Sequence, residues 1–418
     1  MIKIKIPNNN IPERRYIIGI LFNEFLGLDF IIEVGSSDYE ITLPNKKQLI
    51  IEDTFFNKYH QDLEYLKLEN IPKDIYKLDI FARSFFMLTR WEEYVNKNRD
   101  SHNRFPATES LAYKQGFLDR PIVNEELEKL KKRLLELDGS LKFKKREFEF
   151  ILTHDVDIAY KYGNKISMLK ELVIDLVKRK SIKLFFYNLN IQIKYLLKLE
   201  KDPFDTYDYL MDLSEKVGVK SYFFLHSSSD TKQDINNDKY IKKIVDKIKK
   251  RGHFLGYHPA YNAYNHLKLF IQDKEKIEDI IEDKLTFGRA HFLRFEVPTT
   301  WQIWENAKME WDSSLSYADR EGFRCGICYP YSVFNILTRK KLNLKERPLI
   351  VMEGSFTTYQ PNIKPEDMEI KIKKLIDEVK KYNGEFVFLW HNSNFNGAWG
   401  NNFGYLYNKV LNENTLSN

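Results

Sequence analysis

The stretch EFEFILTHDVD, residues 147–157, decides the fold class of the C-terminal part of this 418-residue chain. A strand-length apolar run ends there abruptly in the polar sequence THDVD. Five later apolar runs also stop at an ionisable residue: SYFFL at His226, HFLGY at His258, AHFLRF at Glu296, PLIVM at Glu353 and FVFLW at His391. Continuously apolar runs of this length are typical of strands that are buried on both faces of a parallel sheet.

Helix-length amphipathic segments separate these runs, and several of them end in glycine, as at 207–218 and 240–252. A further segment of this kind covers 369–381. Strands that alternate with helices indicate βα units, and six or more such units favour a (β/α) barrel over an open sheet. In either arrangement the catalytic and ligand-binding side chains lie at the carboxyl ends of the strands. The repeated His and acidic residues at those ends are therefore the main functional signal.

A charged helix-like run at 124–138 ends in Gly139 and Ser140 and leads into a lysine-rich connector. This change of composition predicts a small α/β domain over 1–140 and a second domain over 147–418. The first domain combines strand-like runs at 39–43 and 48–53 with a helical pattern at 78–95. Its sequence does not indicate a function.

Composition excludes several classes of protein. Hydrophobic residues make up 43% of the chain, which excludes intrinsic disorder, and two cysteines cannot form a disulfide framework. The net charge of +6 is a small excess of 66 cations over 60 anions, and many lysines alternate with Glu and Asp, so we expect no nucleic-acid partner. Acidic residues interrupt the apolar stretch 16–34, so no membrane span is expected. The N-terminus lacks a signal-peptide pattern, and we expect a cytoplasmic protein.

The strand ends offer candidates for acid–base and metal chemistry. Asp155 and Asp157 are two residues apart, so on a strand they face the same side. If a cation binds one carboxylate, the other can act as a general base, although both could instead cap a helix. His258 is a candidate metal ligand, and His391 is a candidate general acid or ligand. His226 could line the site or begin a loop.

The segment GRAHFLRFEVP, residues 288–298, places Arg289, His291 and Arg294 at alternating positions. Arg294 could pair with Asp155, contact an anionic substrate, or bridge parts of the core. Asp312 lies in a polar loop that could reach the site or form turns. Glu353 could be a ligand, a buried partner for an arginine, or a capping group.

Five stretches, in this order, carry a resemblance to a known family: FILTHDVD, GHFLGYHPAY, HFLRFEVPTTW, WDSSLSYADREGFRCG and FVFLWHNSNF. Over about residues 147–400 the chain resembles the polysaccharide deacetylase family (NodB-homology, carbohydrate esterase family four), in a branch with a THDVD motif. The N-terminal stretches RSFFMLTRWEEYV and NRFPATES resemble an uncharacterised domain that often precedes this branch.

The resemblance implies a distorted (β/α) barrel of about seven strands. It also implies metal-dependent removal of acetyl groups from an N-acetylated sugar or a surface-polysaccharide precursor, with a divalent metal such as zinc. The implied roles are: catalytic base Asp155, metal ligands Asp157 and His258, base-orienting arginine Arg294, acid-supporting carboxylate Asp312, and general acid His391.

One position departs from the family pattern. The second metal histidine would lie four residues after His258, where this chain has Asn262, a poorer zinc ligand. A third ligand could come from Asn262 itself, from His226 or from His291; otherwise the site binds metal weakly or has lost it. We expect His226, His291 and Trp301 to contact substrate.

Two other functions stay open at this point. The first is a non-catalytic carbohydrate-binding or scaffold protein on a degenerate deacetylase barrel. Asn262 suggests it, and so do Trp301, Trp304 and Trp311, whose rings could stack on sugars. The second is a metal-dependent hydrolase of another small amide on the same barrel.

Overall fold

The computed structural model describes residues 1–418 except 163–164, 227–237, 361, 396–402 and 416–418. The described chain forms two units, and each combines segments that are distant in the sequence. Unit 1 comprises 1–149, 292–351 and 374–386, and unit 2 comprises 150–291, 352–373 and 387–418. The division at residue 140 that composition suggests stays a prediction.

Unit 1 contains a four-stranded sheet in the order β2-β1-β3-β4: β1 (Ile2–Ile6), β2 (Phe30–Val34), β3 (Tyr39–Thr42) and β4 (Gln48–Ile51). β1 runs parallel to β2, and the other pairs are antiparallel. In β1 the isoleucines are buried and the two lysines are exposed, as the two-residue period of a strand requires. A helix, α1 (Ile11–Ile18), and a π-helical segment (Gly19–Phe25) follow β1.

The helical pattern at 78–95 forms two helices, α2 (Ile80–Thr89) and α3 (Trp91–Val95). The break is at Arg90, whose φ of 52° is left-handed. Its buried guanidinium lies against the carboxylates of Glu92 and Glu93. The left-handed backbone at Arg90 ends α2, and α3 begins at the next residue.

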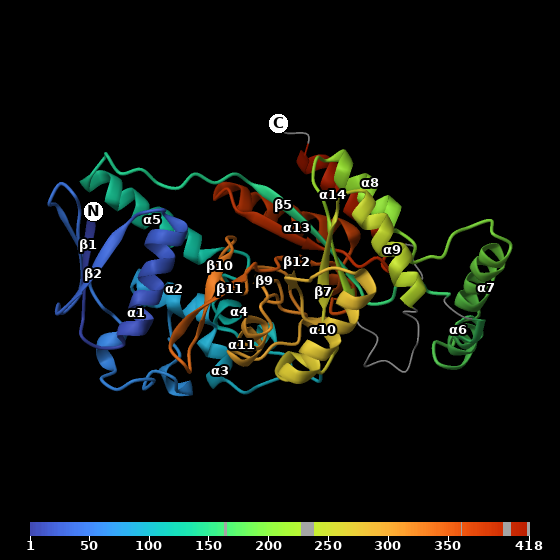
Figure 1. Ribbon diagram of the computed structural model, residues 1–418, viewed down its shortest axis with the longest axis horizontal. Coiled ribbons are helices and arrows are strands. Elements are labelled where there is room, and N and C mark those ends of the chain that lie inside the picture. Colours follow the sequence, from blue (N-terminus) through green and yellow to red (C-terminus); the bar gives the residue numbers. More distant parts are fainter. Residues whose placement is uncertain (163–164, 227–237, 361, 396–402, 416–418) are drawn as a thin grey trace. The chain divides into compact units, whose positions relative to one another are not determined.

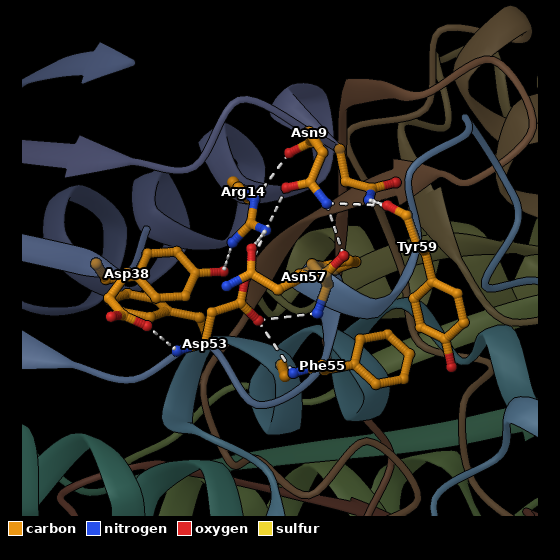
Figure 2. A network of polar contacts seen from close by, with 12 residues as sticks. Asn9, Arg14, Asp38, Asp53, Phe55, Asn57 and Tyr59 are labelled. Carbon is orange, nitrogen blue, oxygen red and sulfur yellow. Dashed lines mark hydrogen bonds and ion pairs between the residues drawn. The ribbon is translucent and has the colours of Figure 1, made fainter. Parts of the chain in front are cut away.

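A buried polar network joins the segments that lead into and out of the small sheet (Figure 2). The Arg14 guanidinium pairs with Asp53 at 2.5 Å, and both side chains are fully buried. Arg14 also donates to the Tyr39 hydroxyl at 2.6 Å and to the side chain of Asn9 at 2.7 Å. Asp53 in turn accepts the backbone N–H of Phe55 at 3.0 Å. Each buried charge is thus compensated, as burial of an ion pair requires.

The remaining elements of unit 1 include three strands in the order β10-β11-β9: β9 (Trp311–Asp312), β10 (Tyr331–Asn335) and β11 (Lys340–Glu346). β10 and β11 form an antiparallel pair, and β11 runs parallel to β9. The helices are α4 (Leu111–Lys114), α5 (Ile122–Leu137) and α11 (Thr299–Asn306). Short 3-10 turns cover Phe56–Lys58, Leu68–Asn70, Ile75–Lys77 and Ala107–Glu109.

Unit 2 is built on neighbouring strands in the order β8-β7-β6-β5-β13-β12. Their bounds are β5 (Glu149–Val156), β6 (Tyr222–His226), β7 (Phe254–His258), β8 (Phe287–Gly288), β12 (Val351–Met352) and β13 (Glu385–Leu389). The pairs β5–β6, β6–β7 and β7–β8 are parallel. Seven of the eight residues of β5 are buried in succession, as expected for a strand covered on both faces. The predicted α/β class with a large parallel sheet is confirmed.

Helices connect these strands, and α9 packs against β7 and α10. Their bounds are α6 (Lys165–Val177), α7 (Ile182–Leu196), α8 (Tyr207–Lys216), α9 (Asp238–Lys250), α10 (Leu267–Ile281), α12 (Glu353–Thr357), α13 (Pro365–Lys381) and α14 (Gly404–Thr415). Among the described residues no helix is long and apolar enough to cross a membrane.

One predicted strand is wrong. The run AHFLRF, residues 290–295, does not continue as a strand: β8 ends at Gly288, and a 3-10 turn covers His291–Leu293. Phe292 and Leu293 have φ values of 60° and 53°, which interrupt any extended conformation. The alternation of faces predicted for this segment therefore does not hold.

Candidate active site

The register of the parallel strands brings the polar strand ends of unit 2 to one edge. Asp155 lies beside Phe224 of β6, and His226 lies beside His258 of β7. Each of these polar side chains is at or near the carboxyl end of its strand. Because the strands are parallel, their ends meet at the same edge of the sheet, where ligand sites of such folds form.

Gly288 allows the next strand to approach closely enough to contribute to the same edge. A Cβ atom on Gly288 would overlap the carbonyl oxygen of Tyr257 in β7. Only glycine permits this contact without displacing the backbone. Arg289 and His291 follow directly, so this close approach places both near the ends of β6 and β7.

Three imidazoles gather at this edge. His226, His258 and His291 each offer a ring nitrogen, and these three atoms lie within 4.8 Å of one another. The ring centroids of His226 and His291 are 4.1 Å apart, and those of His258 and His291 are 5.0 Å apart. This is the clustering expected of ligands that converge on a single ion.

Backbone carbonyls determine which nitrogen each of two rings presents. Nδ1 of His258 lies 2.7 Å from the carbonyl oxygen of Arg289, and Nδ1 of His226 lies 3.2 Å from that of His258. Since a carbonyl can only accept, both Nδ1 atoms carry the proton and donate it. In the neutral ring Nε2 then holds a lone pair. A backbone acceptor on the second nitrogen is characteristic of metal-ligating histidines.

Burial favours the neutral form of two of these rings. It lowers the pKa of His226, and the neighbouring His258 lowers it further. Burial also takes the pKa of His291 well below its usual range, against the opposing effect of Asp157. A neutral imidazole binds a metal without first losing a proton.

Asp157 supplies a carboxylate beside the three imidazoles. Its Oδ1 lies 3.0 Å from Nε2 of His258 and 3.4 Å from Nε2 of His291. Burial alone would raise the pKa of Asp157, but His291, His258 and His391 outweigh it and hold the pKa well below its usual range. Three imidazoles and one carboxylate are a donor set that suits zinc and similar divalent ions.

Asp155 lies at the same edge of the sheet as Asp157, but it forms an ion pair with an arginine. Its Oδ1 accepts a hydrogen bond from the Arg289 guanidinium at 2.8 Å, and its Oδ2 lies 4.0 Å from Nε2 of His258. Arg289 is fully buried and also donates to the hydroxyl of Thr153 at 2.9 Å. The guanidinium thus orients the carboxylate and compensates its charge.

His391 follows β13 and is held by Glu353, the first residue of α12. Nδ1 of His391 lies 2.6 Å from Oε1 of Glu353, and Nε2 lies 3.7 Å from Oδ2 of Asp157. The backbone N–H of His391 and the side chain of Asn394 donate to the same glutamate oxygen. Burial would lower the pKa of His391, but Glu353, Asp157 and Asp155 outweigh it and raise the pKa to about 10. This imidazole is therefore cationic at neutral pH.

The structure brings together six of the residues that the sequence singled out: Asp155, Asp157, His226, His258, His291 and His391. Asn262 is exposed and precedes the 3-10 turn Ala263–Asn265. Sequence reasoning missed the pairing of Arg289 with Asp155. For Glu353 it left three roles open, a ligand, a partner for an arginine or a capping group, and the contact with His391 was not among them.

Three other predicted site residues belong to unit 1: Arg294, Asp312 and Trp301. Arg294 donates its Nε–H to the carbonyl of His102 at 2.9 Å, and it is Arg289 that forms an ion pair with Asp155, at 2.8 Å. Asp312 is fully buried and accepts the hydroxyl of Ser314. It lies near Glu346, whose pKa is raised well above its usual range by burial and then by Asp312.

The prediction for Trp301 requires correction. Its ring is fully buried, and its Nε1–H donates to Glu346 at 3.1 Å. Trp304 is fully buried as well. A ring with no exposed face cannot stack on a sugar, so both are core residues. The aromatic argument for a non-catalytic carbohydrate-binding protein loses these two residues.

Comparisons with known proteins add the following. Residues 2–139 match a family of unknown function, DUF7033. No curated protein matches the chain. A protein from Mycobacterium smegmatis, assigned as a polysaccharide deacetylase, is similar at 11% identity and a TM-score of 0.41, over 66% of this chain and 86% of its own.

Two further solved structures are similar at lower scores. The 4-alpha-glucanotransferase from Thermococcus litoralis has 13% identity and a TM-score of 0.37, over 66% of this chain and 38% of its own. The peptidoglycan deacetylase PdaC from Bacillus subtilis, as a mutant, has 11% identity and a TM-score of 0.27, over 65% and 84%. Such distant likenesses include deacetylases, but they assign no activity to this chain.

Proposed function

We propose that this chain is a metal-dependent hydrolase that removes acetyl groups from an N-acetylated sugar or a surface-polysaccharide precursor. The observation that carries the proposal is the arrangement at one sheet edge. Three histidines and Asp157 form a cluster there. The cluster is flanked by the Asp155 carboxylate, which is paired with Arg289, and by the His391 imidazole, which is paired with Glu353. We further propose that the strands of this part of the chain form a distorted (β/α) barrel of about seven strands.

His226, His258, His291 and Asp157 would hold the metal, for which zinc is the first candidate. The donor set fits, since two of the rings have Nδ1 committed to a carbonyl. In this proposal His226 and His291 supply the ligation that the family pattern assigns to the position of Asn262. When bound, the divalent cation would polarise the acetyl carbonyl as a Lewis acid.

Asp155 takes the role of general base and accepts the proton of the attacking water. Arg289 supports Asp155 in this role, because its guanidinium donates to Oδ1 and fixes the orientation of the carboxylate. Arg289 therefore takes the orienting role that the resemblance assigned to Arg294. His391 donates a proton to the nitrogen of the departing amino sugar, and Glu353 holds Nδ1 so that Nε2 faces the site.

The sugar as substrate rests on the resemblance of the ordered motifs, not on a contact in the site. The direct test measures acetate released from an N-acetylated hexosamine oligosaccharide. We expect dialysis against a chelator to abolish release, and zinc or cobalt to restore it. Acetate release that is insensitive to chelation would contradict the proposed metal dependence. Absence of release from N- and O-acetylated sugars with every divalent metal would contradict the activity.

Glu353→Gln is expected to move the alkaline limit of activity. In the wild-type chain His391 keeps its proton up to about pH 10, largely because of Glu353. Removing that charge lowers the pKa of His391, so the acidic form is lost at a lower pH and kcat/KM should begin to fall there. The measurement is kcat/KM against pH.

Glu369→Gln is the matched control, because Glu369 bonds to surface lysines of α13 and α14. Its pH profile should coincide with that of the wild type. An unchanged alkaline limit in Glu353→Gln would show that His391 is not the general acid.

A further inference from the structure

The helices α6 and α7 form a hairpin that buries polar side chains and exposes many apolar ones. They lie side by side in Figure 1 and pack on each other. Between them lie buried polar groups. The side-chain amide of Asn188 donates to Asp175 at 2.7 Å, and that of Gln192 donates to the carbonyl of Met168 at 3.0 Å. Both amides and the carboxylate are almost fully buried. Among the described residues of the two helices, Met168 is the one apolar side chain that is buried, and the other buried side chains are these three polar ones.

Many apolar side chains of the hairpin are exposed instead. Of 27 large hydrophobic residues exposed among the described residues, thirteen lie between 166 and 199: Ile166, Leu169, Val173, Ile174, Leu176, Val177, Ile182, Phe186, Tyr187, Ile193, Leu196, Leu197 and Leu199. A patch of this density is unusual on a soluble surface and marks a contact with a partner or membrane.

The spacing shows that the exposed residues form stripes. Leu169, Val173 and Leu176 recur at four and three residues on α6, so they share one exposed face of this helix, whereas Asp175 is buried. On α7, Ile182, Phe186 and Ile193 lie on the face opposite Asn188. Each helix is thus amphipathic with its apolar stripe outward.

Positive charge accompanies these stripes. Residues 166–201 contain eight lysines and arginines and three acidic residues, a net charge of +5. The whole chain carries +6, so nearly all of its excess charge is in this segment. The two helices have 13 and 15 residues. At about 1.5 Å per residue each falls short of the roughly 30 Å hydrocarbon core of a bilayer. The hairpin can lie on a membrane but not cross it.

We propose that the α6–α7 hairpin docks on the surface of a lipid bilayer that contains anionic lipids. Exposed Leu, Ile, Val and Phe side chains would enter the boundary between headgroups and acyl chains, and the lysines would contact the anionic headgroups. A second copy of the hairpin is the less suitable occupant, because it would bring +5 against +5. The proposal does not depend on the proposed hydrolase activity.

The test is flotation of the full chain with vesicles of phosphatidylcholine, with and without phosphatidylglycerol. We expect binding to the anionic vesicles that weakens as salt is raised. The double variant Leu169→Ser with Phe186→Ser should bind about tenfold more weakly or worse, since two large apolar side chains no longer enter the bilayer. Ile370→Ser is the matched control: Ile370 and Leu169 are both 65% exposed, and Ile370 lies outside the hairpin.

A pair of charge-reversal variants separates the electrostatic from the apolar contribution to vesicle binding. Lys178→Glu with Lys183→Glu should weaken binding to anionic vesicles, whereas Lys268→Glu with Lys276→Glu on α10 should not. All four lysines are exposed, so the thermal unfolding midpoint should stay unchanged and report that the variants fold.

Three results would overturn the proposal. One is no flotation of the wild-type chain with anionic vesicles, and another is equal binding by the wild type and both hairpin variants. The third is a concentration-dependent dimer, seen by analytical ultracentrifugation, that the serine substitutions dissociate while vesicles bind neither form. That result would assign the patch to a second copy.

Discussion

Asp155→Asn is expected to lower kcat/KM for acetate release by about 10²–10⁴-fold, the usual contribution of a general base. The amide keeps an oxygen that can accept from Arg289, so the side chain should keep its position. It cannot accept a proton from water. The measurement is acetate release under saturating metal, with bound metal determined on the same samples.

The control for this variant is Asp279→Asn, an exposed carboxylate on α10 that should leave kcat/KM unchanged. Metal content should be the same in both variants, because Asp155 is not among the proposed ligands. If Asp155→Asn retains activity within about threefold of the wild type, Asp155 is not the general base.

His258→Ala is expected to remove the bound metal. Nε2 of His258 lies 4.0 Å from Asp155 and 3.0 Å from Asp157, and its Nδ1 is fixed by the Arg289 carbonyl. Losing a direct ligand should weaken metal binding by more than about 100-fold, beyond the effect of losing a supporting partner. Elemental analysis of the purified variant measures this, and acetate release should fall with metal content.

His60→Ala is the control, since His60 is exposed and lies in unit 1. Its metal content should equal that of the wild type. Full metal occupancy in His258→Ala would remove His258 from the ligand set and with it the basis of the proposed metal site.

The participants in the candidate site were predictable from the strand pattern. Apolar runs ending at Asp155, His226, His258 and His391 indicate parallel strands, and the ends of parallel strands share an edge. What each side chain contacts was not predictable in the same way. Whether His391 meets Glu353 depends on how α12 begins beside β13, a contact between residues 38 positions apart.

Arg289 shows a second limit of the sequence pattern. The alternation of faces holds only while the backbone is extended, and the chain leaves the strand conformation after Gly288. The left-handed residues Phe292 and Leu293 then change the direction of the chain. The two arginines of this segment therefore have different partners, Asp155 for Arg289 and the His102 carbonyl for Arg294.

The sequence by itself determined the α/β class, the parallel strands and the kinds of side chain at their ends, because burial and backbone period act locally along each segment. Only the tertiary structure decided that three histidines meet, that Trp301 is a core residue, and that the α6–α7 hairpin turns its apolar stripes outward. An amphipathic pattern defines two faces of a helix but not which of them packs inward. That choice depends on partners such as Asp175 and Asn188, which are contributed by different helices.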